Sequence, residues 1–149
     1  MRDLADLLVG RFVGTDDIHA GPWSTAQTAA VEVTTHSEVD GAVLLMRMHE
    51  RRESGAFDVL NLFMRDQVNG DILLYSFDPL GYPPDPPARG RVRDGTLVLS
   101  RSTERGHSMT VFEATPTGLR WAKRFRPSED VEWRTTVAGT LDREQGTRP

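Results

Sequence analysis

Few side chains in this sequence have the types and spacing that metal binding or catalysis requires. The four histidines, His19, His36, His49 and His107, are too far apart for a His-x-His or His-Glu-x-x-His motif. We therefore expect no metal ion and no cofactor. A nucleophile elbow, a phosphate-binding loop and a dinucleotide fingerprint are also absent, so we assign no catalytic residue.

Two pairs of titratable residues could act as acid and base, but each has a simpler interpretation. Glu32 and His49 would meet across neighbouring strands, where an exposed charge pair is the favoured interpretation. Asp16 and Asp17 are adjacent in the chain, and we interpret them as the solvated end of a strand.

Lys123 has the most distinctive chemistry, because 17 of the 18 basic residues are arginine and it is the only lysine. An ammonium group inside an aromatic barrel could bind the carboxylate head group of a small molecule. The alternative is a lysine at the rim, whose stem packs on Trp121 while its charge stays in water. The net charge of −4 gives no general basic excess, so we expect no nucleic-acid partner.

The elements that must position these residues are short strands separated by turns. Gly-containing turn signals divide alternating apolar and polar stretches, a pattern typical of an up-and-down antiparallel meander. Five prolines between positions 79 and 87 predict a stiff loop at a barrel rim. The turn signals are Asp40-Gly41, Ser54-Gly55, Asn69-Gly70, Asp94-Gly95, Arg105-Gly106 and Thr117-Gly118.

Such a meander must stack as two sheets or close into a barrel, because little helix is available to cover it. Only the first eight residues read as helix, with Leu4, Leu7 and Leu8 at helical spacing. We predict one all-β domain at 1–143, a ten-stranded antiparallel up-and-down β-barrel with a short N-terminal helix, and a flexible tail at 144–149. The expected strands are 10–19, 26–36, 42–51, 56–66, 71–78, 88–93, 96–103, 107–115, 118–126 and 131–141.

The turns also predict which residues share a face. A turn at Asp40-Gly41 pairs residues whose numbers sum to 81, and the later turns place Lys123 beside Phe112, inside the barrel. Depending on the length of the loop after 126, Trp133 or Arg134 would lie opposite Lys123, Trp133 as a cation–π neighbour. One bulge would move all of these side chains outside. The predicted ligand-binding residues are Lys123, Trp121, Trp133, Phe112, Arg101, Asn61, Phe63, Met46 and Met48.

The segment Leu4-x-x-Leu7-Leu8-Val9-Gly10-Arg11-Phe12-Val13-Gly14, followed by the meander, resembles the start of the calycin superfamily of lipocalins, fatty-acid-binding proteins and nitrobindin-like barrels. Those proteins share a short helix that runs into a Gly-x-Trp strand, and Phe12 replaces the tryptophan here. The stretch Phe77-Asp78-Pro79 is similar to one in bacterial lipocalin-like domains of unknown function.

The sequence differs from two of these families in one feature each. Only Ala20 to Thr25 separate the first two strands, which leaves no room for the helical lid of fatty-acid-binding proteins. Nitrobindin-like barrels hold haem through a histidine near the C-terminus, but no histidine follows His107, so we expect no haem.

The expected function is non-catalytic binding of a small, largely apolar or amphipathic ligand, anionic and fatty-acid-like if Lys123 or Arg101 meets it. One alternative is a small isomerase, cyclase or hydrolase that uses acid–base residues in the barrel. Another is a ligand-free interaction module or homodimer that uses outward Leu60, Leu62 and Met64. We expect a cytoplasmic protein without a membrane span, because the sequence has no cysteine, no apolar leader and no long apolar run.

Overall fold

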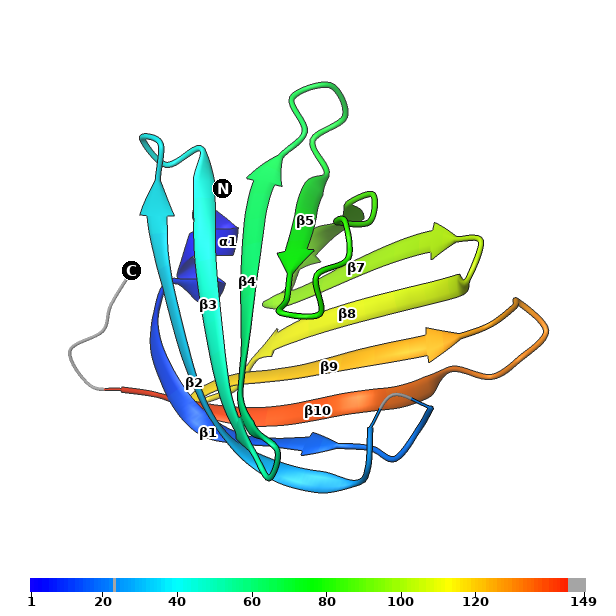
Figure 1. Cartoon of the computed structure of the whole chain (residues 1–149). Helices are drawn as coiled ribbons and strands as arrows, with labels where there is room; N and C mark the ends of the chain where they lie inside the picture. Colours follow the sequence, from blue (N-terminus) through cyan, green and yellow to red (C-terminus); the bar gives the residue numbers. More distant parts are fainter. Residues whose placement is uncertain (23, 145–149) are drawn as a thin grey trace.

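The computed structural model describes residues 1–22 and 24–144, which form a closed barrel of ten antiparallel strands and one short helix (Figure 1). Each strand pairs with its neighbours in the chain, and β1 pairs with β10 to close the barrel. The predicted fold class is confirmed. The elements are α1 (Arg2–Leu8), β1 (Gly10–Ile18), β2 (Gln27–Glu38), β3 (Val43–Arg52), β4 (Gly55–Arg65), β5 (Ile72–Phe77), β6 (Ala88–Arg93), β7 (Thr96–Thr103), β8 (Gly106–Ala114), β9 (Gly118–Arg126) and β10 (Arg134–Arg143).

The faces predicted from the turns are confirmed in both halves of the barrel, and so is the pairing predicted across Asp40-Gly41. Met46 lies opposite Asn61, and Met48 lies opposite Val33 and Val59. The Asp40-Gly41 turn is longer than two residues, since it spans 39–42, but it lengthens both sides equally and keeps the sum of 81. In the second half, Lys123 lies opposite Thr110 and not beside Phe112 as predicted, because Phe112 pairs with Trp121. The connection covers 115–117 and is centred one residue before the expected Thr117-Gly118 turn, which moves the pairing by two residues and keeps each side chain on its predicted face.

The prediction for the last hairpin is wrong. Neither Trp133 nor Arg134 lies opposite Lys123; Val137 does, while Arg134 pairs with Phe125. The connection covers 127–133 and a bulge follows between Thr135 and Val137, so the count from the turn fails. Trp133 instead stacks against the guanidinium of Arg126, 4.4 Å from its ring centre.

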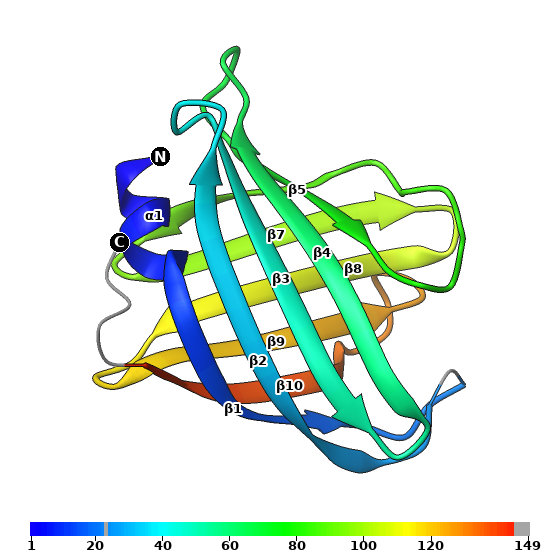
Figure 2. The same ribbon diagram turned by 60° about the vertical axis from the view of Figure 1, so that its left-hand side comes forward.

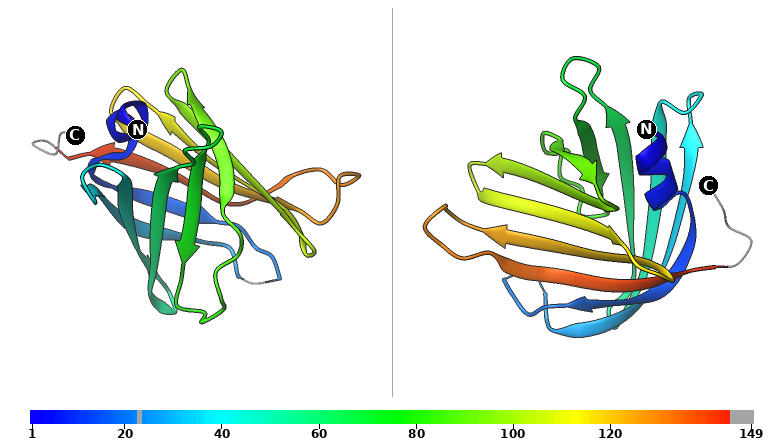
Figure 3. Two further views of the ribbon diagram at one scale, coloured as in Figure 1. Left: turned by 90° about the horizontal axis from the view of Figure 1, so that it is seen from above. Right: turned by 180° about the vertical axis from the view of Figure 1, so that it is seen from behind.

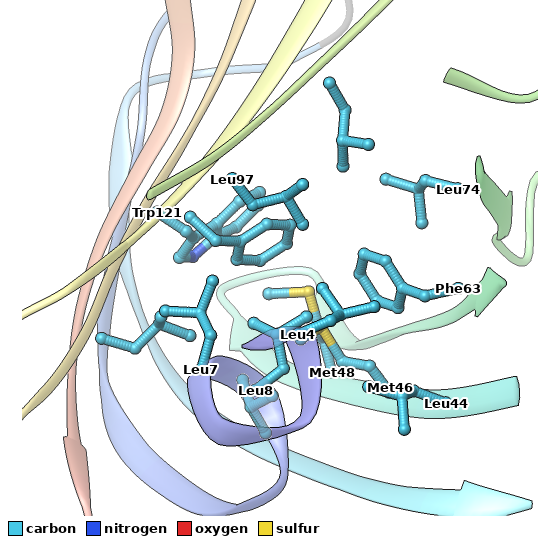
Figure 4. Packing of buried hydrophobic residues seen from close by; sticks show 14 of the residues in the cluster. Leu4, Leu7, Leu8, Leu44, Met46, Met48, Phe63, Leu74, Leu97 and Trp121 are labelled. Atoms are coloured by element: carbon cyan, nitrogen blue, oxygen red, sulfur yellow. The ribbon is translucent and has the colours of Figure 1, made fainter. Parts of the chain in front are cut away.

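The helix fills one end of the barrel. Figure 2 shows α1 beside the beginning of β1, and Figure 4 shows its leucines on the same cluster as Met46, Met48 and Phe63. Leu4, Leu7 and Leu8 are buried because their helical spacing puts them on one face. Burying each leucine contributes about 1.5–3 kcal/mol, so the helix closes this end with a packed core. We call this end of the barrel the helix end.

The opposite end, where β1 stops and β2 begins, carries only loops in the described ranges (Figure 3). We call it the open end. The proline-rich segment 78–87 joins β5 to β6 there, as predicted. Asp85 ties this loop to the β7–β8 hairpin through ion pairs with Arg101 (3.3 Å) and Arg105 (2.6 Å). Of the predicted tail, the structure describes only Glu144, whose N–H donates to the Arg11 carbonyl (2.9 Å); residues 145–149 lie outside the described part.

Candidate functional site

Lys123 projects into the barrel from the middle of β9 and yet remains accessible to water. Its inward neighbours along the strand are Trp121, which is 8% exposed, and Phe125, which is half-buried, whereas Lys123 itself is exposed. The surrounding wall also desolvates the ammonium, which lowers the pKa of Lys123. The Lys123 side chain is surrounded by the barrel wall and still has solvent-exposed surface. We infer that water enters the lumen from the open end as far as this side chain.

Of the two basic side chains in this part of the lumen, Arg101 has an ion-pair partner and Lys123 has none among the described residues. Arg101, on β7, forms an ion pair with Asp85, and its positive charge also lowers the pKa of Lys123. Asp78 and Asp85 of the proline-rich loop act in the opposite direction but more weakly. Among the described residues no carboxylate forms an ion pair with Lys123. The ammonium is therefore a positive charge without a direct counter-ion.

A row of aromatic rings forms the floor beneath Lys123. Trp121 stacks on Phe112 with ring centres 6.1 Å apart and planes at 17°, and Phe112 meets Phe63 edge to face at 5.9 Å. Phe63 and Phe112 are fully buried, and Trp121 has the largest exposed fraction of the three rings. The sequence correctly predicted that these rings share a face with Lys123. The ring that lies next to the ammonium along β9 is that of Trp121.

The other predicted lining residues belong to the packed core below this floor. Met46 and Met48 are 0% and 3% exposed, and the amide of Asn61 donates to their sulfur atoms at 3.6 and 3.5 Å. Ser76 donates to the amide oxygen of Asn61 at 2.6 Å. These contacts satisfy Asn61 within the barrel wall, which explains how a polar side chain is accommodated there.

A pair of buried acidic side chains, Asp16 and Glu50, lies behind Trp121. The sequence did not predict this pair. Asp16 is fully buried, and its Oδ1 accepts a 2.8 Å hydrogen bond from the indole N–H of Trp121. Glu50, 4% exposed, comes from β3, and Arg52 donates to its Oε1 at 2.8 Å. The interpretation of Asp16 as a solvated strand end is wrong, whereas its neighbour Asp17 is exposed and accepts a hydrogen bond from Thr28.

Burial raises the pKa of Asp16 to about 8, with a further contribution from its hydrogen bond with the Glu50 carboxyl. Asp16 Oδ2 and Glu50 Oε2 receive no hydrogen bond from an ordinary donor group in the described chain. One proton shared between the two carboxyls provides the missing donor and removes the repulsion between two buried charges. Asp16 therefore keeps its proton at neutral pH.

The backbone makes room for the Asp16–Trp121 hydrogen bond at Gly139. A Cβ at this position would lie 2.1 Å from Asp16 Oδ1 and 2.4 Å from Trp121 Nε1. Gly139 lies between the two strands that carry these side chains, opposite Asp16 on β1 and Trp121 on β9. Only glycine leaves the space in which the carboxyl and the indole meet.

The first acid–base pair considered from the sequence lies on the outer surface. Glu32 and His49 are opposite each other, as predicted, but each has another partner. The Glu32 carboxylate lies 3.6 Å from Arg11, and the imidazole of His49 contacts Asp58. This pair faces away from the lumen and has no access to a ligand inside it.

The outer wall offers a shallow groove of about 530 Å³ over β6 and β7. Two of its three arginines are already paired, Arg89 with Asp66 (2.9 Å) and Arg91 with Asp71 (3.1 Å), and Asp71 itself lines the groove. We therefore do not assign it as an anion site. Elsewhere on the outside, the predicted apolar stripe of Leu60, Leu62 and Met64 is half-buried.

The described residues hold neither a metal-binding cluster nor a helix that could span a membrane. No group of three or more His, Cys, Asp or Glu side chains is arranged to hold a metal ion within 1–22 and 24–144. In the same ranges, no helix has both the length and the apolar character needed to cross a lipid bilayer.

Comparisons with known proteins show a similar fold. No family model and no curated protein sequence matches this chain. Among solved structures, the crystal structure of Rv2717c from M. tuberculosis superposes with a TM-score of 0.68 at 13% sequence identity. The match covers 95% of this chain and 96% of that one. At this identity the likeness concerns the fold alone.

Proposed function

We propose that this protein is a calycin-like barrel that binds a small amphipathic anion, without catalysis, in the open half of its lumen. Lys123 is the residue that meets the anionic group, and Trp121 and Phe125 contact the apolar body of the ligand. The observation that carries this proposal is an enclosed ammonium that water reaches and that forms no ion pair with any carboxylate of residues 1–22 and 24–144. A desolvated, unpaired charge costs stability, and a bound anion would offset that cost.

The filled helix end limits the size of the ligand. Leu4, Leu8 and Phe12 are fully buried there, and Met46 and Phe63 have no exposed surface. A ligand that enters from the open end therefore reaches the aromatic floor and stops. This favours a compact body, such as a bicyclic aromatic acid or a medium-chain carboxylate, over a long extended fatty acid.

The enzymatic alternative needs an acid–base group that touches the ligand. Asp16 has the displaced pKa that such a role requires, but it has no exposed surface and lies behind the Trp121 indole. His49 and Glu32 face outward. The arrangement around Lys123 thus favours binding over proton transfer to a ligand.

Isothermal titration calorimetry with matched ligands tests the proposal. The probes are 2-naphthoate and octanoate, each compared with its uncharged amide. We expect the carboxylates to bind more tightly than the amides, since a charge-assisted hydrogen bond contributes about 1.5–3 kcal/mol. Lys123→Met should weaken carboxylate binding about tenfold or more and leave the amides nearly unchanged.

The matched control is Arg124→Met, which removes a positive charge from the outer face of the same strand. Arg124 lies next to Lys123 in the chain but faces away from the lumen, opposite Met109. This variant should bind both carboxylates as the unmodified protein does. The proposal fails if neither carboxylate binds at millimolar concentration, or if Lys123→Met and Arg124→Met have the same effect.

A further inference from the structure

The buried carboxyl groups of Asp16 and Glu50 do not contact the ligand in the proposed binding mode. Asp16 nevertheless positions Trp121, which forms part of the wall of the binding site. Asp16 is the hydrogen-bond acceptor of the Trp121 indole, and Trp121 is the inward neighbour of Lys123 on β9. The two partners are 105 residues apart in the sequence, so this bond ties β1 to β9 across β10. The orientation of the floor thus depends on a group that water does not reach.

The acid pair is built to hold one proton. Asp16 Oδ2 and Glu50 Oε2 are both buried, and neither receives a hydrogen bond from a protein donor in the described chain. Arg52 reaches only the other oxygen of Glu50, through Nη2, and its Nε has no partner there. A proton shared between the two carboxyl groups gives Asp16 Oδ2 and Glu50 Oε2 the hydrogen bond that they otherwise lack. Loss of this proton leaves two adjacent carboxylates buried away from water.

Apart from Glu50 and Arg52, the described residues that face Asp16 carry no acidic or basic side chain. β2 places Ala29 opposite Asp16, β10 places Gly139 there, and β9 contributes Trp121. The charged groups that act on it are Glu50, which favours the protonated form, and Arg52, which favours the carboxylate. The more remote Lys123 titrates in the same lumen and must be separated from Asp16 by experiment.

We propose that Asp16 and Glu50 act as a proton-dependent clamp that positions Trp121, so that the lumen holds its ligand when the pair shares a proton and loosens when that proton leaves. Asp16 is a positioning residue in this scheme, because it acts on the ligand only through the indole ring. The effect on affinity rests on the proposed function. The effect on the ring does not, since it exists in the ligand-free barrel.

The physical basis is the geometry at Gly139. The glycine leaves just enough space for the Asp16 carboxyl and the indole to meet, so separating two repelling carboxylates there requires movement of the ring or of the strand. Trp121 in turn stacks on Phe112. A displaced indole therefore changes the surface next to Lys123.

Tryptophan fluorescence of the ligand-free protein tests the clamp directly. Trp23 and Trp133 are replaced by phenylalanine so that Trp121 alone reports, and emission is followed from pH 5 to pH 10. We expect one transition centred near the pKa of Asp16, about 8. In Asp16→Asn the amide still accepts from the indole and donates to Glu50, so the emission should stay that of the low-pH form throughout.

The Asn variant separates Asp16 from Lys123, because Lys123 is intact in it. A transition that persists in Asp16→Asn, or the absence of any transition in the parent, overturns the clamp. Glu50→Gln provides an independent variant: its amide donates to the Asp16 carboxylate without adding charge, so the transition should move to lower pH. An unchanged midpoint in Glu50→Gln also contradicts the clamp.

Affinity for 2-naphthoate at pH 6 and pH 9 then tests the link to binding. From pH 6 to pH 9 the affinity of the parent protein for 2-naphthoate should fall by about fivefold or more beyond its fall in Asp16→Asn. This is about the factor that one hydrogen bond contributes to binding. Equal losses in both proteins would overturn the coupling between clamp and ligand. Absence of naphthoate binding at either pH would contradict the proposed function, while the fluorescence result would still decide whether the clamp exists.

Discussion

Replacing Gly139 by alanine is the sharpest test of the packing around Asp16. The added Cβ would lie 2.1 Å from Asp16 Oδ1, 2.4 Å from Trp121 Nε1 and 2.6 Å from Trp121 Cδ1, all closer than real contacts allow. The hydrogen bond must therefore open. Loss of a buried hydrogen bond costs about 1–3 kcal/mol, and overpacking costs about the same again, so the expected loss is roughly 2–6 kcal/mol.

Thermal unfolding followed by circular dichroism measures this loss. At about 2–4 °C per kcal/mol for a domain of this size, Gly139→Ala should lower the Tm by at least about 4 °C. Gly21→Ala is the control, because its Cβ would meet only the end of the flexible Arg134 side chain, at 3.4 Å. That variant should stay within about 0.5 kcal/mol of the parent.

A double variant shows whether the cost arises at the indole. Trp121→Leu removes the N–H donor and most of the ring, so Gly139→Ala should cost at least about 1 kcal/mol less in that background. If Gly139→Ala unfolds like Gly21→Ala, or if its cost is the same with and without the indole, the account of the Asp16–Trp121 contact is refuted.

Three further predictions concern charges. Urea unfolding should show stability falling from about pH 4 to about pH 8, because folded Asp16 keeps a proton that the unfolded chain releases above 3.8; the same slope in Asp16→Asn would contradict this. Lys123→Met should raise the Tm of the ligand-free protein, because burial disfavours the ammonium; a lower Tm would contradict that view. Asp85→Asn should strengthen 2-naphthoate binding in calorimetry, because it frees the charge of Arg101; unchanged or weaker binding would show that Asp85 does not compete with the ligand.

Local signals in the sequence were enough to predict the barrel and much of its interior. Turn residues mark the ends of strands, and a known turn determines the pairing on both sides of it. The pair of Val33 with Met48 and the common face of Phe112, Trp121 and Lys123 follow from this counting alone. Where a connection is irregular, as between Arg126 and Arg134, the counting failed by several residues.

The acid pair required information that strand counting does not contain. Alternation along β1 from Phe12 through Gly14 to Asp16 was a signal that Asp16 points inward, and it was available in the sequence. Its contacts with Trp121 and Glu50 depend on how the closed barrel brings three non-adjacent strands together. Such contacts follow from closure and shear, which pairwise register does not specify.

A crystal structure of the protein with 6-bromo-2-naphthoate tests the central claim most directly, because the anomalous signal of bromine locates the ligand and its orientation. The account predicts one ordered molecule in the open half of the lumen, with its carboxylate within about 4 Å of Lys123 Nζ and its rings against Trp121. A lumen without bromine density, or a carboxylate that points to the open end while Lys123 remains unpaired, would contradict it.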